Sequence, residues 1–199
     1  MALETYRRKR NFRSTPEPRG KIARSGKGLS FVVQKHAARQ LHYDFRLEIG
    51  GVLASWAIPK GPSLDPGERR LAVHVEDHPL EYKKFHGVTP KSHYGAGSVE
   101  LWDRGTWVPD GNPRAGLQQG KLKFHLKGKR LTGGWNLVRM GGRNRQSGKD
   151  NWLLIKEHDE AATHEPIVER ERSASSARAQ RLRSNSLKSS RRDQCEITC

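Results

Sequence analysis

The chain has 199 residues, 30% of them charged, and a formal net charge of +17. That length suggests one domain with tails, and the charge favours a polyanionic partner, with nucleic acid as the first candidate. A membrane is disfavoured, because no signal peptide, long apolar run or basic amphipathic helix is predicted. The two cysteines, Cys195 and Cys199, have no nearby histidine and do not predict a zinc site.

The basic charge is spread along the chain. Residues 1–30 carry a net +7, residues 31–159 a net +8 and residues 160–199 a net +2. We expect residues 1–30 to form an extended basic arm, either a flexible leader or a segment that follows a phosphate backbone. Residues 31–158 form the predicted folded domain. Residues 159–199 are predicted to be a disordered tail or linker, since they lack aromatic residues and are rich in Ser, Arg, Ala and Glu.

Within residues 31–158, short apolar segments separated by Gly, Pro and Asp predict strands. The expected strands are Phe31–Gln34, Leu41–Ile49, Val52–Ile58, Leu71–Val75, Ser98–Asp103, Gly105–Val108, Lys121–Leu126, Gly134–Met140 and Asn151–Glu157. Gly50-Gly51 is predicted to turn one hairpin and Arg104 a second. Asp77–Leu80 is expected to break a strand, and Leu80–Phe85 to form a helical turn.

The expected fold class is mostly all-β. Short strands at even spacing with glycine-rich turns favour a β-barrel or a sandwich. All five tryptophans lie between positions 56 and 152, which bounds the predicted core.

The segment Leu41–Glu48 alternates apolar and polar residues, as a half-buried strand does. The residues expected to face the core are Leu41, Tyr43, Phe45 and Leu47, and those expected on the other face are His42, Asp44, Arg46 and Glu48. If the turn at residues 37–40 brings His36 beside His42, two imidazoles and the Asp44 carboxylate make a site for manganese, zinc or iron. Arg46 would then reach an anion held by the metal.

The same alternation fits a simpler structure. His42, Asp44 and Arg46 could form the solvated face of an antiparallel strand, with Asp44 paired to Arg46. Spacing alone leaves both interpretations open.

A series of longer motifs carries a resemblance to a known family. These motifs are Phe31-Val-Val-Gln-Lys-His36, Leu41-His-Tyr-Asp-Phe-Arg46, Ser55-Trp56, Pro59-Lys-Gly-Pro62, Arg70-Leu-Ala-Val73, Glu76-Asp-His-Pro79, Tyr94-Gly-Ala-Gly97, Trp102-Asp-Arg-Gly-Thr-Trp107 and Asn151-Trp-Leu-Leu-Ile-Lys156. In this order, over roughly residues 6–158, they resemble the 3′-phosphoesterase domain of bacterial DNA ligase D.

The resemblance implies a compact β-barrel with an active-site groove on one side. It implies an enzyme of non-homologous end joining that removes a 3′-terminal ribonucleoside from a primer strand and then hydrolyses the remaining 3′-phosphate to a 3′-hydroxyl. The implied cofactor is Mn²⁺, with other divalent transition metals as alternatives. The implied partners are DNA or primer–template ends, Ku, and a DNA ligase or polymerase. The implied location is cytoplasmic, at the nucleoid, without a membrane.

Residue by residue, His36, His42 and Asp44 match the family's metal ligands. Further matches to its catalytic and phosphate-contacting positions are Arg46, Lys60, Arg70, His78 and Tyr82, and the matches in the arm are Arg10 and Glu17. Without the resemblance, the sequence favours solvated cations for Lys60 and Arg70 and a packed side chain for Tyr82, and His78 could be a turn histidine.

Asn11 departs from the family pattern, in which an aspartate follows the arm arginine. An amide carries no charge and cannot act as a base, so the sequence predicts a competent 3′-phosphatase that removes ribonucleosides slowly. Two alternatives to this enzyme remain open. One is a non-catalytic nucleic-acid-binding barrel that keeps the scaffold, and the other is an RNA-processing phosphodiesterase outside end joining.

Overall fold

The structure, a computed structural model, describes residues 3–23, 28–90, 93–141 and 150–167. The chain divides into a unit ending at Ala162 and a second unit, of which only residues 163–167 are described. The predicted disordered tail, from residue 168 onward and with both cysteines, lies outside the described residues. No helix in the described part of the chain has the length and apolar character needed to cross a membrane.

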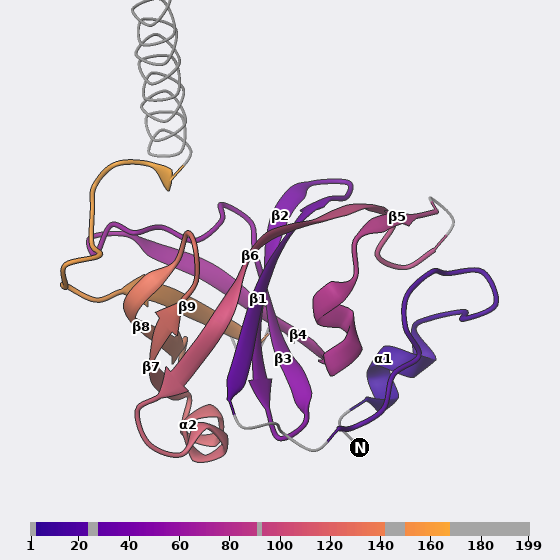
Figure 1. Cartoon of the computed structure of the whole chain (residues 1–199), viewed down its shortest axis with the longest axis horizontal. Helices are drawn as coiled ribbons and strands as arrows, with labels where there is room; N and C mark the ends of the chain where they lie inside the picture. The colour runs from indigo at the N-terminus through magenta and orange to yellow at the C-terminus, as the bar shows by residue number, and fades with distance from the viewer. Residues whose placement is uncertain (1–2, 24–27, 91–92, 142–149, 168–199) are drawn as a thin grey trace, which may run out of the picture. The chain divides into compact units, whose positions relative to one another are not determined.

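The first unit is built mainly of antiparallel strands (Figure 1). The strands are β1 (Leu29–Ala37), β2 (Leu41–Ile49), β3 (Val52–Ile58), β4 (Arg69–Pro79), β5 (Gly87–Thr89), β6 (Gly97–Pro109), β7 (Lys121–Lys127), β8 (Thr132–Arg139) and β9 (Asn151–Lys156). The helices are α1 (Glu4–Arg8), the 3₁₀ helix η1 (Leu80–Lys84) and α2 (Pro113–Gln119).

The strands form one sheet in the order β1-β2-β3-β4-β9-β8-β7-β6-β5, and β1 also pairs with β6. That additional pairing closes every strand except β5 into an antiparallel barrel, which confirms the expected fold class. The predicted hairpin turn at Gly50-Gly51 is also confirmed. Both glycines have positive φ, 63° and 86°, and Ile49 pairs with Val52 across them, as in a two-residue turn.

The barrel interior is filled by aromatic side chains. Phe45 of β2 stacks on Phe124 of β7 with ring centroids 6.0 Å apart, and Trp56 of β3 meets Trp152 of β9 at 5.9 Å. Neither pair joins neighbouring strands, so these contacts cross the interior. Of the β2 residues predicted to face the core, Phe45 does so, whereas Leu41, at the first position of the strand, is 49% exposed.

The outer face of β2 is buried as well, so the simpler interpretation is wrong about solvation, although the Asp44–Arg46 pair that it included is present. Asp44 is 7% exposed and Arg46 is 2% exposed. A second apolar cluster lies on the outer side of the wall formed by β1 to β4. Its buried members are Tyr6, Leu53, Tyr82, Phe85 and Val99, with Phe12 and Leu80 packed against them. Because Tyr82 lies in η1 and Tyr6 in α1, these two helices cover this wall.

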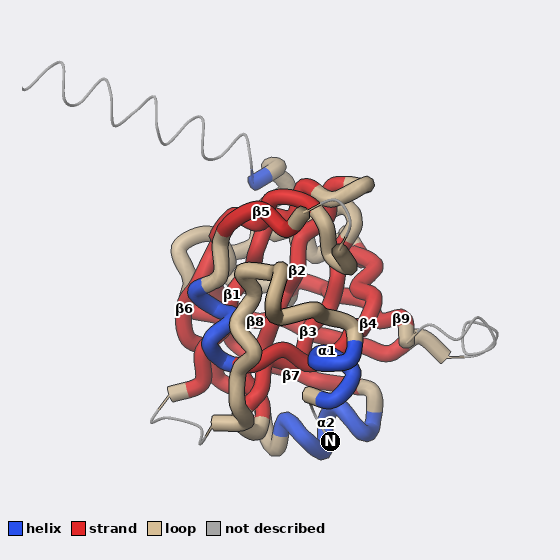
Figure 2. The backbone as a smooth tube through the Cα atoms, turned by 90° about the vertical axis from the view of Figure 1, so that its right-hand side faces the viewer, coloured by secondary structure: helices blue, strands red, loops and turns tan. Residues whose placement is uncertain are grey.

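In its described residues, 3–23, the N-terminal arm is folded, although an extended segment was expected. Helix α1 packs against β4 (Figures 1 and 2). The Tyr6 hydroxyl donates to the Pro18 carbonyl at 2.5 Å, and Arg7 donates to the Gly20 carbonyl at 2.9 Å. These contacts fold residues 3–23 back on themselves, and bonds from Ala23 to the Gly51 carbonyl and from Arg10 to Glu76 hold them against the barrel.

The predicted hairpin around Arg104 is wrong. Strand β6 runs without a turn from Gly97 to Pro109, because β1 pairs along one edge while β5 and β7 pair along the other. The irregularity lies instead at a bulge, where Val33 pairs with Asp103 and Gln34 with Leu101. Gly105 does not turn the chain. It allows close packing, since a Cβ there would lie 2.1 Å from the Lys127 carbonyl oxygen.

Strand β4 runs further than the predicted Leu71–Val75, but it ends at Pro79, within the segment Asp77–Leu80 that was expected to break it. Proline has no N–H to extend a ladder and ends the strand there. The predicted helical turn follows as η1 at Leu80–Lys84. The longer strand extends the outer wall far enough to carry His78.

We predict that Gly105→Ala lowers the free energy of unfolding by about 1–3 kcal/mol, because the added methyl group would force β6 away from β7. Urea unfolding measures the change. Gly28→Ala is the matched control, since a Cβ at Gly28 meets nothing within 4 Å, and its effect should stay within about 0.5 kcal/mol. Equal effects of the two substitutions would contradict the close-packing explanation.

Candidate active site

The three predicted metal ligands meet on the outer wall of the barrel. His36 of β1 lies directly opposite His42 of β2, so the turn closes as predicted. His36 Nδ1 lies 3.7 Å from Asp44 Oδ2, and His42 Nε2 lies 3.7 Å from Asp44 Oδ1. One ligand atom from each residue falls within 4.8 Å of the others, which suits a shared metal ion.

The protonation of these side chains also fits a metal. His42 Nδ1 donates to the Gln40 carbonyl at 3.0 Å, which leaves Nε2 unprotonated and facing Asp44. His36 Nε2 is buried and has no hydrogen-bond partner in the described residues. Burial alone would raise the pKa of Asp44, but the Arg46 charge and the neighbouring His36 and His42 outweigh it, so the pKa is lowered. Asp44 is therefore a carboxylate at neutral pH.

Arg46 is almost fully enclosed beside this group. Its Nη2 donates to Asp44 at 3.0 Å, its Nε to Gln34 at 2.8 Å and its Nη1 to Ser55 at 2.9 Å. The guanidinium also lies over the Tyr82 ring, 4.8 Å from the centroid. Five N–H groups are available and three are used in these bonds, so two remain to bind an anion in the pocket.

His78 lies on the same wall and is held in one tautomer. Its Nδ1 lies 2.8 Å from the Glu76 carbonyl oxygen, which can only accept, so Nδ1 carries the proton. Its Nε2 therefore accepts from Arg10 Nη2 at 3.2 Å. Burial lowers the pKa of His78 well below its usual value of 6.5, and the charges of Arg46 and Arg10 lower it further. The side chain is neutral at neutral pH.

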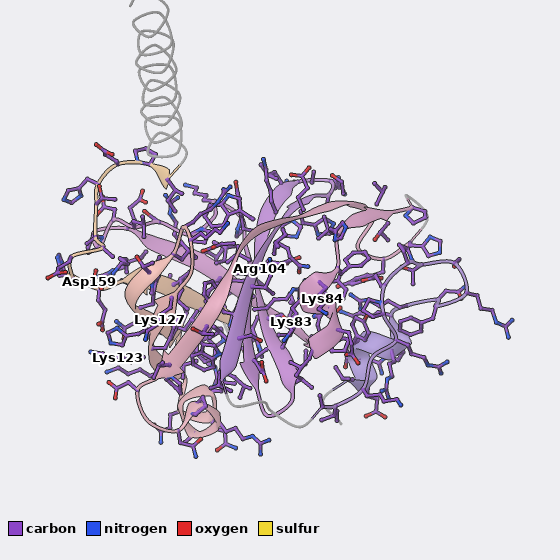
Figure 3. The ribbon with its side chains drawn as sticks, viewed as in Figure 1. Lys83, Lys84, Arg104, Lys123, Lys127 and Asp159 are labelled. Carbon is purple, nitrogen blue, oxygen red and sulfur yellow. The ribbon has the colours of Figure 1, made fainter. Side chains whose placement is uncertain are left out.

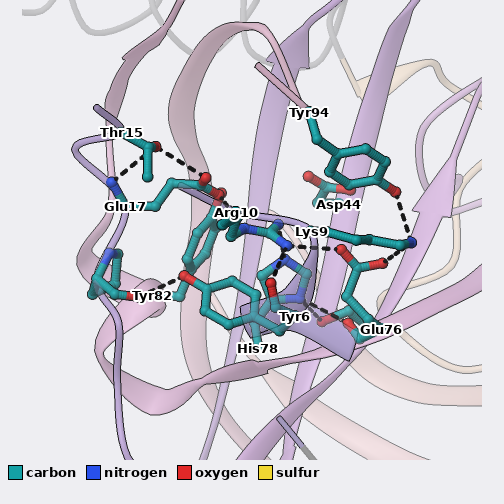
Figure 4. A network of polar contacts seen from close by, with 12 residues as sticks. Tyr6, Lys9, Arg10, Thr15, Glu17, Asp44, Glu76, His78, Tyr82 and Tyr94 are labelled. Atoms are coloured by element: carbon teal, nitrogen blue, oxygen red, sulfur yellow. Dashed lines mark hydrogen bonds and ion pairs between the residues drawn. The ribbon is translucent and has the colours of Figure 1, made fainter. Parts of the chain in front are cut away.

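The arm residues Arg10 and Glu17 lie within this pocket (Figure 4). Arg10 is bound between two buried carboxylates, with its Nε 2.9 Å from Glu17 and its Nη1 3.0 Å from Glu76. Glu17 also accepts from the Tyr82 hydroxyl at 3.0 Å. The charge of Arg10 is thus paired inside the protein and is not free to follow an external phosphate backbone.

The pocket brings together eight of the ten predicted site residues. They are Arg10, Glu17, His36, His42, Asp44, Arg46, His78 and Tyr82. Lys60 and Arg70 are not among its lining residues, and both line a separate hollow with Glu68 and Leu71. Arg70 is paired there with Glu68.

Residues 34–139 match the family model of the DNA ligase D 3′-phosphoesterase domain. The chain belongs to this family. It is 54% identical over 159 residues to a multifunctional non-homologous end joining protein LigD of Pseudomonas aeruginosa, and the match covers 79% of this chain and 19% of that protein.

Mycobacterial relatives of the family match to a lesser degree. The identity is 41% over 165 residues with LigD of Mycolicibacterium smegmatis, covering 79% of this chain and 21% of the relative. It is 43% over 155 residues with a multifunctional non-homologous end joining DNA repair protein LigD of Mycobacterium tuberculosis, covering 76% and 19%. The chain spans about a fifth of the length of these relatives.

Three further residues of this 3′-phosphoesterase domain line or support the pocket, and the sequence did not single them out. Glu76 is two positions before His78 on β4, and Gln34 is two positions before His36 on β1. Residues two apart share one face of a strand, so the alternation that identified Asp44 and Arg46 could have found both. Ser55 is paired opposite Arg46, which only the register between β2 and β3 reveals.

We predict that His78 in the free protein keeps its proton on Nδ1 and titrates well below pH 6.5. Arg10→Ala should raise its pKa, because the substitution removes a neighbouring positive charge and admits water to the pocket. Histidine side-chain NMR over a pH series reports both the tautomer and the pKa.

Arg8→Ala is the matched control for this titration, since Arg8 lies on the same short helix and is exposed. This control substitution should leave the pKa of His78 unchanged. An equal shift in the two variants, or a His78 that titrates near 6.5 in the unmodified protein, would contradict the assignment.

Proposed function

We propose that this chain is a metal-dependent 3′-end phosphoesterase that acts on DNA or primer–template ends in double-strand break repair. It would remove a 3′-terminal ribonucleoside and hydrolyse a 3′-phosphate to a 3′-hydroxyl. One observation carries the proposal. In this member of the 3′-phosphoesterase family, a His-His-Asp group lies in the same pocket as Arg46 and His78.

His36, His42 and Asp44 would hold the metal, and the mixed nitrogen and oxygen donors suit Mn²⁺. A bound divalent ion would act as a Lewis acid on phosphoryl oxygens. Arg46 would donate its two remaining N–H groups to the phosphate. Since its other N–H groups are fixed by Gln34, Ser55 and Asp44, little reorganisation is needed when charge develops in the transition state.

His78 would change its role when substrate enters. In the free pocket its Nε2 accepts from Arg10, and the pKa is too low for it to act as an acid. A phosphate beside Nε2 supplies negative charge, which favours the imidazolium. His78 would then donate a proton to the leaving oxygen, while Arg10 would lose its bond to His78 and stay paired with Glu17 and Glu76.

The setting of this activity is part of the same proposal. Its partners would be DNA ends carrying a 3′-ribonucleotide or a 3′-phosphate, together with Ku and a DNA ligase or polymerase, in the cytoplasm at the nucleoid. The names of the LigD relatives support this setting, since they place those proteins in non-homologous end joining.

We predict that His42→Ala and Asp44→Asn each abolish saturable Mn²⁺ binding, measured by calorimetry. Hydrolysis of a 3′-phosphate primer should fall at least about a hundredfold in each, because the charge stabilisation around the phosphoryl group is lost. His86→Ala is the control, since His86 is exposed and lies outside this group. Nucleic-acid binding with no metal-dependent hydrolysis, even in the unmodified protein, would favour a non-catalytic barrel.

We predict that Asn11→Asp speeds ribonucleoside removal relative to phosphate hydrolysis. Asn11 is exposed, and its side-chain oxygen accepts from the Arg13 amide at 3.2 Å. An aspartate keeps that hydrogen bond and restores the family's charge next to Arg10. Because small errors in positioning reduce rates by up to about a hundredfold, we expect a change in the ratio of up to that size.

The measurement compares initial rates on two primers, one ending in a 3′-hydroxyl ribonucleotide and one in a 3′-phosphate. Asn112→Asp is the matched control, since Asn112 is also exposed and accepts backbone N–H groups, at the start of α2. An unchanged ratio in Asn11→Asp would show that position 11 does not govern the first step.

A further inference from the structure

Four basic side chains lie on one face of the barrel outside the pocket. They are Lys83 and Lys84 of η1, Arg104 of β6 and Lys127 of β7, here called the basic strip (Figure 3). Lys84, Arg104 and Lys127 are exposed, and none of the three has an ion-pair partner in the described part of the chain. Their charges therefore face solvent.

Strand register places these side chains side by side. Lys83 Nζ lies 3.4 Å from the Ser30 hydroxyl, Ser30 pairs with Thr106, and Thr106 pairs with Lys127. Arg104 is two positions from Thr106 and so projects from the same face of β6. Neighbouring strands are about 4.8 Å apart, so the strip crosses β1, β6 and β7 within about 10 Å.

Nearby acidic groups do not neutralise the strip. Glu48 is 2% exposed and accepts from the Ser30 hydroxyl and amide. Asp103 is 4% exposed and accepts backbone N–H groups, among them those of Arg104 and Leu131. Glu157 is paired with Lys123, at the far end of β7 from Lys127. Counted at full charge, Glu48 and Asp103 are still outnumbered by the four cations of the strip, so the strip is net positive.

We propose that the basic strip binds the sugar–phosphate backbone of duplex nucleic acid upstream of the 3′ end that is processed. The strip begins at Lys83, next in the chain to Tyr82, which lines the catalytic pocket. A duplex presents one negative charge per about 1.7 Å of its axis, so a strip of this width faces several phosphates. Hydroxyls of Thr106 and Thr132 lie among the cations, and hydroxyls also bind phosphate oxygens.

An acidic protein is the less favoured partner, because the strip lacks the apolar centre typical of a protein interface. The choice of duplex rests on the proposed function, whereas the location of the binding surface rests on the charges themselves. The arm does not provide an equivalent surface at positions 9 and 10, since Lys9 and Arg10 are both paired with Glu76.

The test is the double substitution Arg104→Gln/Lys127→Gln. Binding to a primer–template duplex is measured in chelator, without hydrolysis, over a series of salt concentrations. The slope of log affinity against log salt should become shallower by about 1.8, which corresponds to two lost phosphate contacts, and the affinity at low salt should fall about tenfold or more.

The matched control is Arg114→Gln/Lys121→Gln, which removes one arginine and one lysine that are also exposed. Lys121 is about 20 Å from Lys127 along β7. The control should keep the salt slope of the unmodified protein. Equal slopes in the two double variants would overturn the proposal, as would a loss confined to single-stranded oligonucleotide.

A second readout separates this proposal from the proposed function. Hydrolysis of a 3′-phosphorylated dinucleotide, too short to reach the strip, should be unchanged in Arg104→Gln/Lys127→Gln, while KM on the long primer–template should rise about tenfold. Loss of dinucleotide hydrolysis would mean that the substitutions disturb the pocket, and would overturn the strip's separate role. If the unmodified protein hydrolyses neither substrate, the proposed function fails, and the binding experiment still decides the strip.

Discussion

The candidate active site depends on one buried cation. Arg46 is 2% exposed on the outer wall of the barrel, and a buried charge without partners is unfavourable by several kcal/mol. Its partners come from every side, from Gln34 of β1, Asp44 of β2, Ser55 of β3 and the ring of Tyr82 in η1. Satisfying one guanidinium therefore fixes the register of three strands and the position of the helix that covers them.

The packing of the barrel interior explains why the site lies outside the barrel. The interior is filled by Phe45, Trp56, Phe124 and their neighbours, which leaves no room for a solvated substrate. The other face of β2 carries the polar residues, and it becomes a pocket only because η1 and the folded arm form walls beside it. Arg10 joins the arm to this wall through Glu76 and His78, and Glu17 of the arm bonds to Tyr82, so arm and pocket form one hydrogen-bonded network (Figure 4).

Much of the site could be predicted, because its central part is local in sequence. Alternation along β2 assigned Asp44 and Arg46 to one face, and the short turn between Ala37 and Leu41 made the pairing of His36 with His42 foreseeable. Gly50-Gly51 similarly set the next hairpin. Helix α2 was not predicted, although its sequence signals are equally local. Asn112-Pro113 and Gly120 are a capping residue, a first-turn proline and a left-handed terminator that mark the helix α2.

The sequence by itself determined the β2 pattern and the candidate metal-ligand group, because hairpin register and strand alternation follow from neighbouring residues, and its ordered motifs determined the family. Only the tertiary structure decided that the arm folds over the pocket, that Arg10 bonds to His78, and that Lys60 and Arg70 line a different hollow. Those outcomes depend on contacts between residues far apart in the chain, such as Arg10 and Glu76. The wrong prediction of a hairpin at Arg104 also came from distant contacts. Partners on both edges of β6 keep the strand extended where its local sequence favours a turn.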